Sequence, residues 1–206
     1  MSETIHSVPT SSKAIAITFD DGPDKTYTRQ TADMFNAVSG KATFFMIGEK
    51  IEAEPDFVRE IHGEGHEIGN HSYSHPHLTQ IAEAEAFAEL ERTDKAIERT
   101  IGRRPAVFRA PYLDCNEGTL ALAGRFGYGT IGALNLNTRD WETPGVDFIL
   151  EHTWDHIRDG AILLFHDGAG GDRSQTMEAV RILLDKLTAE GYELVTVSEL
   201  LQRQDR

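Results

Sequence analysis

Apolar and polar residues follow two different periods along this chain. Short apolar runs rich in branched and aromatic residues predict buried strands at residues 15–19, 42–47, 107–108, 161–165 and 193–195. Weaker runs predict further short strands near residues 128–131 and 134–136, and residues 67–69 lead into a polar cluster. These runs are too short for helices, so the chain contains many short strands spread over its whole length.

Longer segments between the strands carry apolar residues at helical spacing. They predict helices at residues 28–38, 54–63, 79–101, 117–126, 147–158 and 175–190, and a last helix that begins at Ser198. In the longest one, Thr79 is the expected N-cap and Gly102 the expected end. Repeated strand–helix units predict a mainly parallel sheet with outer helices. Seven or eight units suit a (β/α) barrel, and an open doubly wound sheet is the alternative.

A chain of 206 residues is expected to form one domain with a sizeable core. Residues 1–12 are polar and predict a mobile tail without the apolar core of a signal peptide. No stretch is long enough to cross a membrane. We therefore expect either that the protein is not exported by this route or that the sequence is trimmed.

Acidic residues outnumber basic ones by 34 to 20, which gives a net charge of −14. No basic run is present, so we expect neither a nucleic acid nor a membrane as partner. The single cysteine, Cys115, excludes an intrachain disulfide and a cysteine-based zinc site. A thiol nucleophile would need a histidine partner that the sequence does not reveal.

Two adjacent carboxylates follow the first predicted strand, where residues 18–23 read TFDDGP. Adjacent side chains leaving a strand point in different directions. Asp20 and Asp21 can therefore do different work, one binding a metal ion and the other acting as a base. An ordinary strand-ending turn is the alternative interpretation, because Asp, Gly and Pro are common turn residues.

Three imidazoles lie within residues 71–77, which read HSYSHPH. His71 and His75 are four apart, a spacing that puts two rings on one side of a helical turn, although Pro76 disfavours helical geometry at His75. Neutral imidazole is a common zinc ligand. Two histidines and one aspartate would leave a coordination position open, as catalytic sites do. His77 lies within reach of the cluster, and a polar loop with chance histidines is the alternative.

Three more polar clusters follow apolar runs: RAPY at residues 109–112, DW at residues 140–141 and LFHD at residues 164–167. In this order, the five clusters resemble the motifs of the polysaccharide deacetylase family, also called the NodB-homology domain or carbohydrate esterase family 4. The resemblance covers residues 14–201, nearly the whole chain. Two positions depart from the family pattern: Asn137 stands where Asp is common, and Leu113 stands where Gly is common.

The resemblance implies a distorted (β/α) barrel and one divalent ion held by Asp21, His71 and His75. Zinc is the expected ion, with cobalt or another divalent ion as alternatives. Asp20 matches the catalytic base, and Arg109 matches the residue that holds this base. The backbone N–H of Tyr112 matches an oxyanion donor, and Tyr112 also matches a substrate contact.

On the leaving-group side, His166 matches the general acid and Asp140 matches the residue that orients and charges it. Trp141 and Leu164 match the apolar walls around the acetyl methyl group. His152 and His156 are also four apart, but acidic neighbours favour a solvated helix face there. His62 and His66 are expected to be structural.

The implied activity is metal-dependent removal of acetyl groups from a carbohydrate polymer by a catalytic domain at residues 13–206. N-deacetylation of chitin oligomers or peptidoglycan is expected, with O-deacetylation of acetylxylan as the alternative. The family also implies a monomer that is secreted or in the cell envelope, and a cytoplasmic location stays open. Two other classes remain: an Fe(II) oxygenase, whose facial triad also uses two His and one carboxylate, and an inactive carbohydrate-binding relative.

Overall fold

The computed structural model describes residues 3–168 and 170–205. Within these residues the strands are β1 Ala14–Gly22, β2 Thr43–Met46, β3 Glu67–Asn70, β4 Val107–Phe108, β5 Gly129–Thr130, β6 Ile162–His166 and β7 Glu193–Leu194. The α-helices are α1 Tyr27–Ala37, α2 Gly48–Ala53, α3 Pro55–Gly63, α4 Glu83–Ile101, α5 Glu117–Phe126, α6 Val146–Trp154, α7 Ser174–Ala189 and α8 Val197–Gln202. Strands and helices alternate along most of the chain, as predicted.

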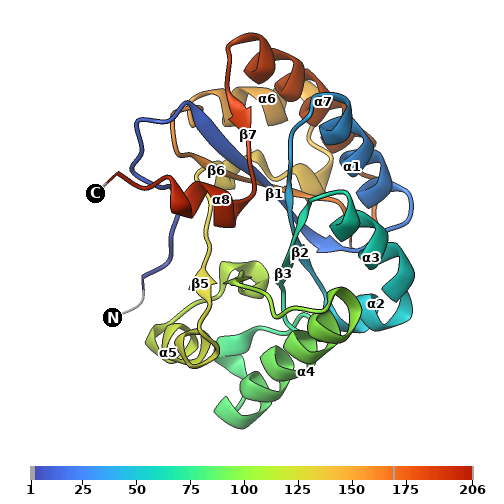
Figure 1. Cartoon of the computed structure of the whole chain (residues 1–206), viewed down its shortest axis with the longest axis vertical. Helices are drawn as coiled ribbons and strands as arrows, with labels where there is room; N and C mark the ends of the chain where they lie inside the picture. The colour runs from blue at the N-terminus through green and yellow to red at the C-terminus, as the bar shows by residue number, and fades with distance from the viewer. Residues whose placement is uncertain (1–2, 169, 206) are drawn as a thin grey trace.

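The described strands form one parallel sheet in the order β5-β4-β3-β2-β1-β6, and β7 pairs with the start of β1. Helices cover the outside of the sheet, and β1 lies between β2 and β6 (Figure 1). This arrangement is the distorted (β/α) barrel predicted from the sequence. Because the strands are parallel, their carboxyl ends meet at one end of the barrel, where such folds place their active sites.

The N-terminal segment fills the space between the two edge strands. Ile5 forms a bridge with Ile131 after β5, and Ser7 forms one with Ala161 before β6. Val8 is buried, and its N–H donates to the carbonyl of Gly160 at 2.8 Å. The mobile tail expected at residues 1–12 thus has backbone partners at residues 5–8, because unpaired edge strands supply contacts that the sequence does not reveal. Residues 1–2 lie outside the described part of the chain.

The pleat of β1 divides its side chains between two cores. One row lies in the large core beneath the outer helices: Ile15, Ile17 and Phe19. Ala14 and Ala16 belong to a smaller core inside the barrel. Thr18 and Asp20 continue this inward row, so the polar end of the strand faces the barrel interior.

Two local predictions are wrong, and one helix was not predicted. The long helix begins at Glu83 rather than Thr79, because Thr79 lies in a short 3₁₀ turn and donates its hydroxyl to Asp114 at 2.7 Å. Residues 134–136 do not form a strand: Leu134 makes one backbone bond to Ile162, and a 3₁₀ turn begins at Leu136. Helix α2 was not predicted, since its six residues are too few to show helical periodicity.

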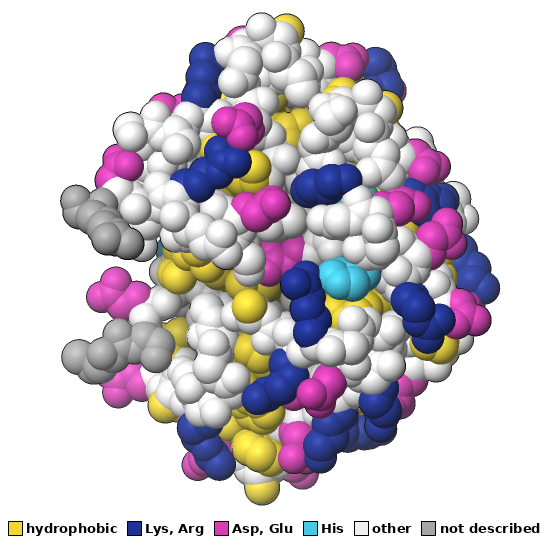
Figure 2. Space-filling model, viewed as in Figure 1, with side chains coloured by type: hydrophobic (Ala, Val, Ile, Leu, Met, Phe, Trp, Pro, Cys, Tyr) yellow, Lys and Arg dark blue, Asp and Glu magenta, His cyan; other side chains and the backbone are white. Residues whose placement is uncertain are grey.

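Acidic and basic side chains are interspersed on the face shown in Figure 2, without a large basic patch there. None of the helices described here has both the length and the apolar character needed to span a membrane.

Candidate active site

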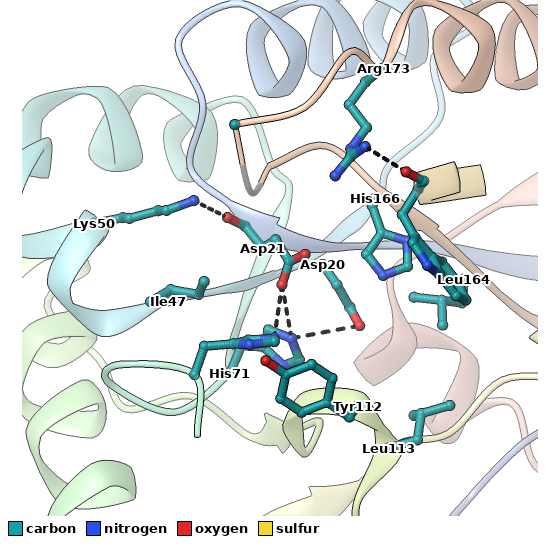
Figure 3. Close-up of a pocket in the computed structure, with 13 residues that line it drawn as sticks. Asp20, Asp21, Ile47, Lys50, His71, Tyr112, Leu113, Leu164, His166 and Arg173 are labelled. Atoms are coloured by element: carbon teal, nitrogen blue, oxygen red, sulfur yellow. Dashed lines mark hydrogen bonds and ion pairs between the residues drawn. The ribbon is translucent and has the colours of Figure 1, made fainter. Parts of the chain in front are cut away.

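A groove of about 810 Å³ opens at the carboxyl ends of the strands. Its lining contains most of the residues singled out in the sequence (Figure 3). They come from β1, from the loops after β3, β4 and β5, and from the end of β6. The structure therefore brings together side chains that lie up to about 150 residues apart in the sequence.

A bulge at the end of β1 lets both adjacent carboxylates reach this groove. Strict alternation would turn Asp21 away from Asp20. Instead, the pairing of β1 with β2 changes register between Asp20 and Gly22, and Asp21 has a φ of 74°. Bulges commonly re-aim a side chain next to an active site. The two carboxylates can therefore take separate roles in one site.

Arg109 is buried and fixes the position of Asp20. Its Nη1 donates to Asp20 Oδ1 at 2.8 Å and to Thr18 Oγ1 at 2.7 Å. Its other nitrogens donate to the carbonyls of Ile131 and Gly132, at 3.2 and 2.8 Å. The guanidinium therefore cannot turn away from Asp20, and one oxygen of that carboxylate is held while Oδ2 faces the groove.

Three ligand atoms gather beside Asp20. The His75 Nε2 lies 3.0 Å and the His71 Nε2 lies 3.5 Å from Asp21 Oδ1. The ligand atoms of these three residues lie within 4.8 Å of one another. His71 donates its Nδ1–H to the carbonyl of Arg109 at 2.8 Å, which leaves the Nε2 lone pair for a metal.

The electrostatics of this trio also suit a cation. Asp21 Oδ1 is buried and accepts no hydrogen bond of good geometry from the described residues. Burial raises the pKa of Asp21, but the imidazoles of His71 and His75 outweigh it and hold the pKa well below its usual range. The carboxylate is therefore ionised, and one of its oxygens is free for a metal ion.

The two histidines are brought together by a loop and not by a helical turn. Ser72 and His75 have φ values of 61° and 64°, and the rings of His71 and His75 lie 4.9 Å apart. Glu89 of α4 holds the residues between them: its carboxylate accepts the N–H of Tyr73 at 2.8 Å and of Ser74 at 2.7 Å. It also accepts the Ser74 hydroxyl at 2.9 Å. The sequence gives no signal for this role, because Glu89 resembles any other acidic residue of an amphipathic helix.

Tyr112 forms the open side of the groove, with 60% of its surface exposed. Its ring stacks on His77 at 3.9 Å and meets the edge of His75 at 4.6 Å. His77 is thus a support for Tyr112, and it is not among the three gathered ligands. In the 3₁₀ turn at residues 111–113, the N–H groups of Leu113 and Asp114 donate to backbone carbonyls. The N–H of Tyr112 takes no part in the backbone hydrogen bonds of this turn.

Leu113 has a φ of 55° and lines the groove. This is the left-handed region that favours glycine, which gives a physical reason for the glycine common in the family at this position. Here a leucine side chain adds an apolar surface to the groove instead.

His166 and Asp140 form a tight pair across from the trio. His166 donates from Nδ1 to Asp140 Oδ1 at 2.8 Å, and its backbone N–H donates to Oδ2 at 2.8 Å. Thr176 donates its hydroxyl to the same Oδ2 at 3.1 Å. Burial lowers the pKa of His166, but the charge of Asp140 outweighs it and raises the pKa to about 9. His166 is therefore a cation at neutral pH, with Nε2 as its remaining donor.

Apolar side chains border this pair. Trp141 is 43% exposed, and its ring meets His166 edge-on at 5.0 Å. Leu164 and Ile47 also line the groove. The sequence interpretation missed Ile47, Lys50 and Arg173. Ile47 ends the predicted strand at 42–47 and Lys50 closely follows it, so the strand-end signal used for the other residues could have found them.

The remaining histidines and the cysteine lie outside the groove lining. His152 stacks on Phe148 at 3.9 Å, and its Nδ1 donates to the Phe148 carbonyl. His66 is buried and accepts the N–H of Ala42 at 3.1 Å. Cys115 is partly buried, and burial raises the pKa of its thiol to about 11, which disfavours the reactive thiolate.

The fold and the site define a (β/α) barrel with a candidate metal centre at its strand ends. A family model described as polysaccharide deacetylase matches residues 7–131. A peptidoglycan-N-acetylglucosamine deacetylase of Bacillus cereus is 40% identical over 95% of this chain and 91% of that protein. A chitooligosaccharide deacetylase of Bradyrhizobium is 33% identical over 91% of this chain and 90% of that protein. The chain therefore belongs to the polysaccharide deacetylase family, carbohydrate esterase family 4, as the motifs predicted.

Solved structures agree with this assignment. A peptidoglycan N-acetylglucosamine deacetylase in complex with an N-oxidanyl-benzamide matches with a TM-score of 0.90 and 31% identity, covering 97% of this chain and 94% of that chain. A family 4 pseudoenzyme from Bacillus anthracis matches with a TM-score of 0.89 and 27% identity, covering all of this chain and 71% of that chain. Since the family includes pseudoenzymes, any activity has to be argued from the site residues.

Proposed function

We propose that this protein is a metal-dependent hydrolase that removes acetyl groups from N-acetylglucosamine-containing glycans, namely peptidoglycan or chitin oligomers. The observation that carries the proposal is the meeting of three units in one groove. These are the ligand trio around Asp21, the Arg109–Asp20 pair and the Asp140–His166 pair. The names of the Bacillus cereus and Bradyrhizobium relatives support an N-acetyl sugar as substrate. Such polymers point to action in the cell envelope or outside the cell.

Asp21, His71 and His75 would hold one divalent ion. Two imidazole nitrogens and one carboxylate oxygen suit zinc and leave further positions open. The free Nε2 of His71 and the unpartnered buried oxygen of Asp21 fit such an ion. When bound, the ion polarises the acetyl carbonyl and lowers the pKa of the attacking water.

Asp20 acts as the general base in this proposal. It takes a proton from water while the water oxygen forms a bond to the acetyl carbon. Arg109 keeps Asp20 in place through the 2.8 Å contact with Oδ1, so Oδ2 can receive the proton. The N–H of Tyr112 donates to the carbonyl oxygen as negative charge develops there.

His166 acts as the general acid. It donates the Nε2 proton to the sugar nitrogen while the carbon–nitrogen bond breaks, which gives acetate and a free amine. Asp140 supports this step because it raises the pKa of His166 to about 9 and fixes the ring through Nδ1. Trp141 and Leu164 exclude water beside the acetyl methyl group.

The other candidate classes explain fewer of these residues. An Fe(II) oxygenase would need the trio around Asp21 but would leave the Arg109–Asp20 and Asp140–His166 pairs without a role. An inactive carbohydrate-binding relative would not need either pair. O-deacetylation of xylan uses the same groups, but neither curated relative named above is a xylan esterase.

The test is metal analysis of the purified protein combined with acetate release from chitin oligomers, peptidoglycan and acetylated xylan. We expect about one zinc per chain, and acetate from an N-acetylated substrate that stops when a chelator removes the metal. Bound metal without acetate release would indicate a binding protein. Acetate from xylan alone would indicate an esterase.

A further inference from the structure

Two cationic side chains line the groove and take no part in the chemistry proposed above: Lys50 and Arg173. The other cations of the site are paired, Arg109 with Asp20 and His166 with Asp140. Within the described residues, no carboxylate oxygen lies within 4.0 Å of Lys50 or Arg173.

Lys50 reaches from α2 to the end of β1 (Figure 3). Its Nζ donates to the backbone carbonyl of Asp21 at 2.7 Å. An ammonium group has three N–H donors, and this contact uses one of them. Lys50 is partly exposed and lines the groove, so its other donors can reach a bound ligand.

Arg173 lies on the other side of Asp21, above His166 (Figure 3). It is only 4% exposed, and its bonds go to backbone carbonyls: Nε to Gly168 at 3.1 Å, and Nη1 to Trp141 and Asp172 at 3.4 Å. These three hydrogen bonds use Nε and Nη1 of Arg173, and Nη2 makes none of them. The nearby carboxylate of Asp172 accepts the Tyr27 hydroxyl and the Ser174 N–H instead.

The two backbone segments that bind these cations are in contact with each other. Gly168 packs on Asp21 so closely that a Cβ on Gly168 would lie 2.0 Å from the Asp21 carbonyl oxygen. That carbonyl binds Lys50, and the carbonyl of Gly168 binds Arg173. Both positive charges therefore lie along one rim of the groove, beside the ligand trio and His166. Arg173 is almost fully buried and has no carboxylate oxygen of the described residues within 4.0 Å, which is unfavourable for a cation, and an anion on the substrate would offset that cost.

We propose that Lys50 and Arg173 form a carboxylate-binding subsite that selects glycans with a carboxylate on the sugar next to the N-acetylated one. This inference rests on the proposed deacetylase function and narrows its substrate. In peptidoglycan every second sugar carries a lactyl group, whose carboxylate is free in strands without stem peptides and is an uncharged amide where a stem peptide is attached, whereas chitin is uncharged. The subsite therefore favours peptidoglycan strands without stem peptides over chitin oligomers of equal length.

The test uses two forms of one substrate that differ only in this charge. They are peptidoglycan tetrasaccharides without stem peptides, with the lactyl carboxylates either free or methyl-esterified. We expect wild type to favour the free acid by about ten- to a hundredfold in kcat/KM, the scale of a hydrogen bond to a charged group. The ratio should fall toward one in Lys50→Met and should also fall in Arg173→Gln. Lys95→Met, which removes a lysine paired with Glu91 on α4, should keep the wild-type ratio.

The outcomes separate the subsite from the deacetylase function. A wild-type ratio near one, or an unchanged ratio in both groove variants, would overturn the subsite. No acetate from either form would instead refute the proposed reaction. In that case calorimetric binding of the two tetrasaccharides to wild type and Lys50→Met reports the same preference without turnover, and equal affinities would again overturn the subsite.

Discussion

The two sides of the groove are built in different ways. On the strand side, Asp20 is 4% exposed, Arg109 is fully buried and His71 is 1% exposed, and each has at least one fixed polar partner. On the loop side, Tyr112 and Trp141 are 60% and 43% exposed, and Tyr112 belongs to a turn with positive φ values.

This difference separates reaction chemistry from polymer binding. Buried groups in a low dielectric interact strongly and keep their geometry. Exposed aromatic rings offer a flat surface to a sugar but gain little from any single contact. Changes on the strand side, and in the buried Asp140–His166 pair, should therefore alter metal binding or the rate. Changes on the loop side should alter substrate affinity.

The largest effect is expected for His71→Ala. This change removes one of three ligands, so we expect loss of most bound metal and of nearly all activity. Metal content and acetate release measure the two losses. His152→Ala is the matched control, because that histidine also has a partner four residues away but packs on Phe148. Full metal occupancy in His71→Ala would contradict the ligand assignment.

The next largest effect is expected for His166→Ala. An amine leaves poorly unless it is protonated, so deacetylation of an N-acetyl sugar should fall by about a hundred- to ten-thousandfold. Hydrolysis of an activated acetate ester should fall less, because an alcohol departs more readily. Asp140→Asn should give a smaller loss in the same direction. Equal losses on amide and ester would mean that His166 is not the leaving-group acid.

The Asp140–His166 pair also predicts how kcat depends on pH. The acid form of His166 is present below its pKa of about 9 and is lost as the pH rises through that value. The kcat for the amide substrate should therefore fall above about pH 9. In Asp140→Asn the pKa should move toward the ordinary histidine value of about 6.5, and the fall should begin at a correspondingly lower pH. An alkaline limb that does not move would contradict this role for Asp140.

Asp20→Asn should lower the rate by roughly a hundredfold, the scale for a missing general base. Metal content should stay the same, because Asp21 and the two histidines are unchanged. Arg109→Ala should give a milder version of this defect. If Asp20→Asn loses the metal instead, the roles of Asp20 and Asp21 are reversed.

A smaller effect is expected for Glu89→Gln, behind the metal-ligand loop. Glutamine can keep the three contacts with Tyr73 and Ser74, because its amide can donate to the Ser74 hydroxyl, but it loses the negative charge that strengthens the bonds from the two N–H groups. We expect about tenfold weaker zinc binding, the lower end of the range for groups that support a ligand. Chelator competition measures it, and Glu91→Gln on the same helix is the control. Unchanged zinc affinity would mean that the loop keeps its shape without Glu89.

The smallest effect is expected on the loop side, for His77→Ala. Removing the ring that stacks on Tyr112 should raise KM a few-fold and leave kcat nearly unchanged, because Tyr112 loses a support but the reacting groups do not move. Steady-state kinetics on a chitin oligomer separates the two constants. A large fall in kcat or a loss of metal would place His77 in the chemistry and weaken the contrast between the two sides.

The sequence predicted the fold class, and it predicted most of the residues that line the groove. Both predictions depend on local signals. An apolar run followed by a polar cluster marks the end of a strand, and in a parallel barrel all such ends meet at one face. For that reason Asp20, His71, Arg109 and His166 could be assigned to one site before their distances were known.

Other features depend on contacts between distant segments, so only the tertiary structure decided them. The bulge that turns Asp21 toward His71 comes from the pairing of β1 with β2. The support of the histidine loop by Glu89 and the rim formed by Lys50 and Arg173 join side chains from separate helices and loops. The N-terminal segment finds its partners at two strand edges, β5 and β6. The sequence by itself thus determined which chemical groups the protein has and in what order they follow strands. Their orientation and neighbours were decided by packing, because these depend on backbone pairing and burial that no local pattern encodes.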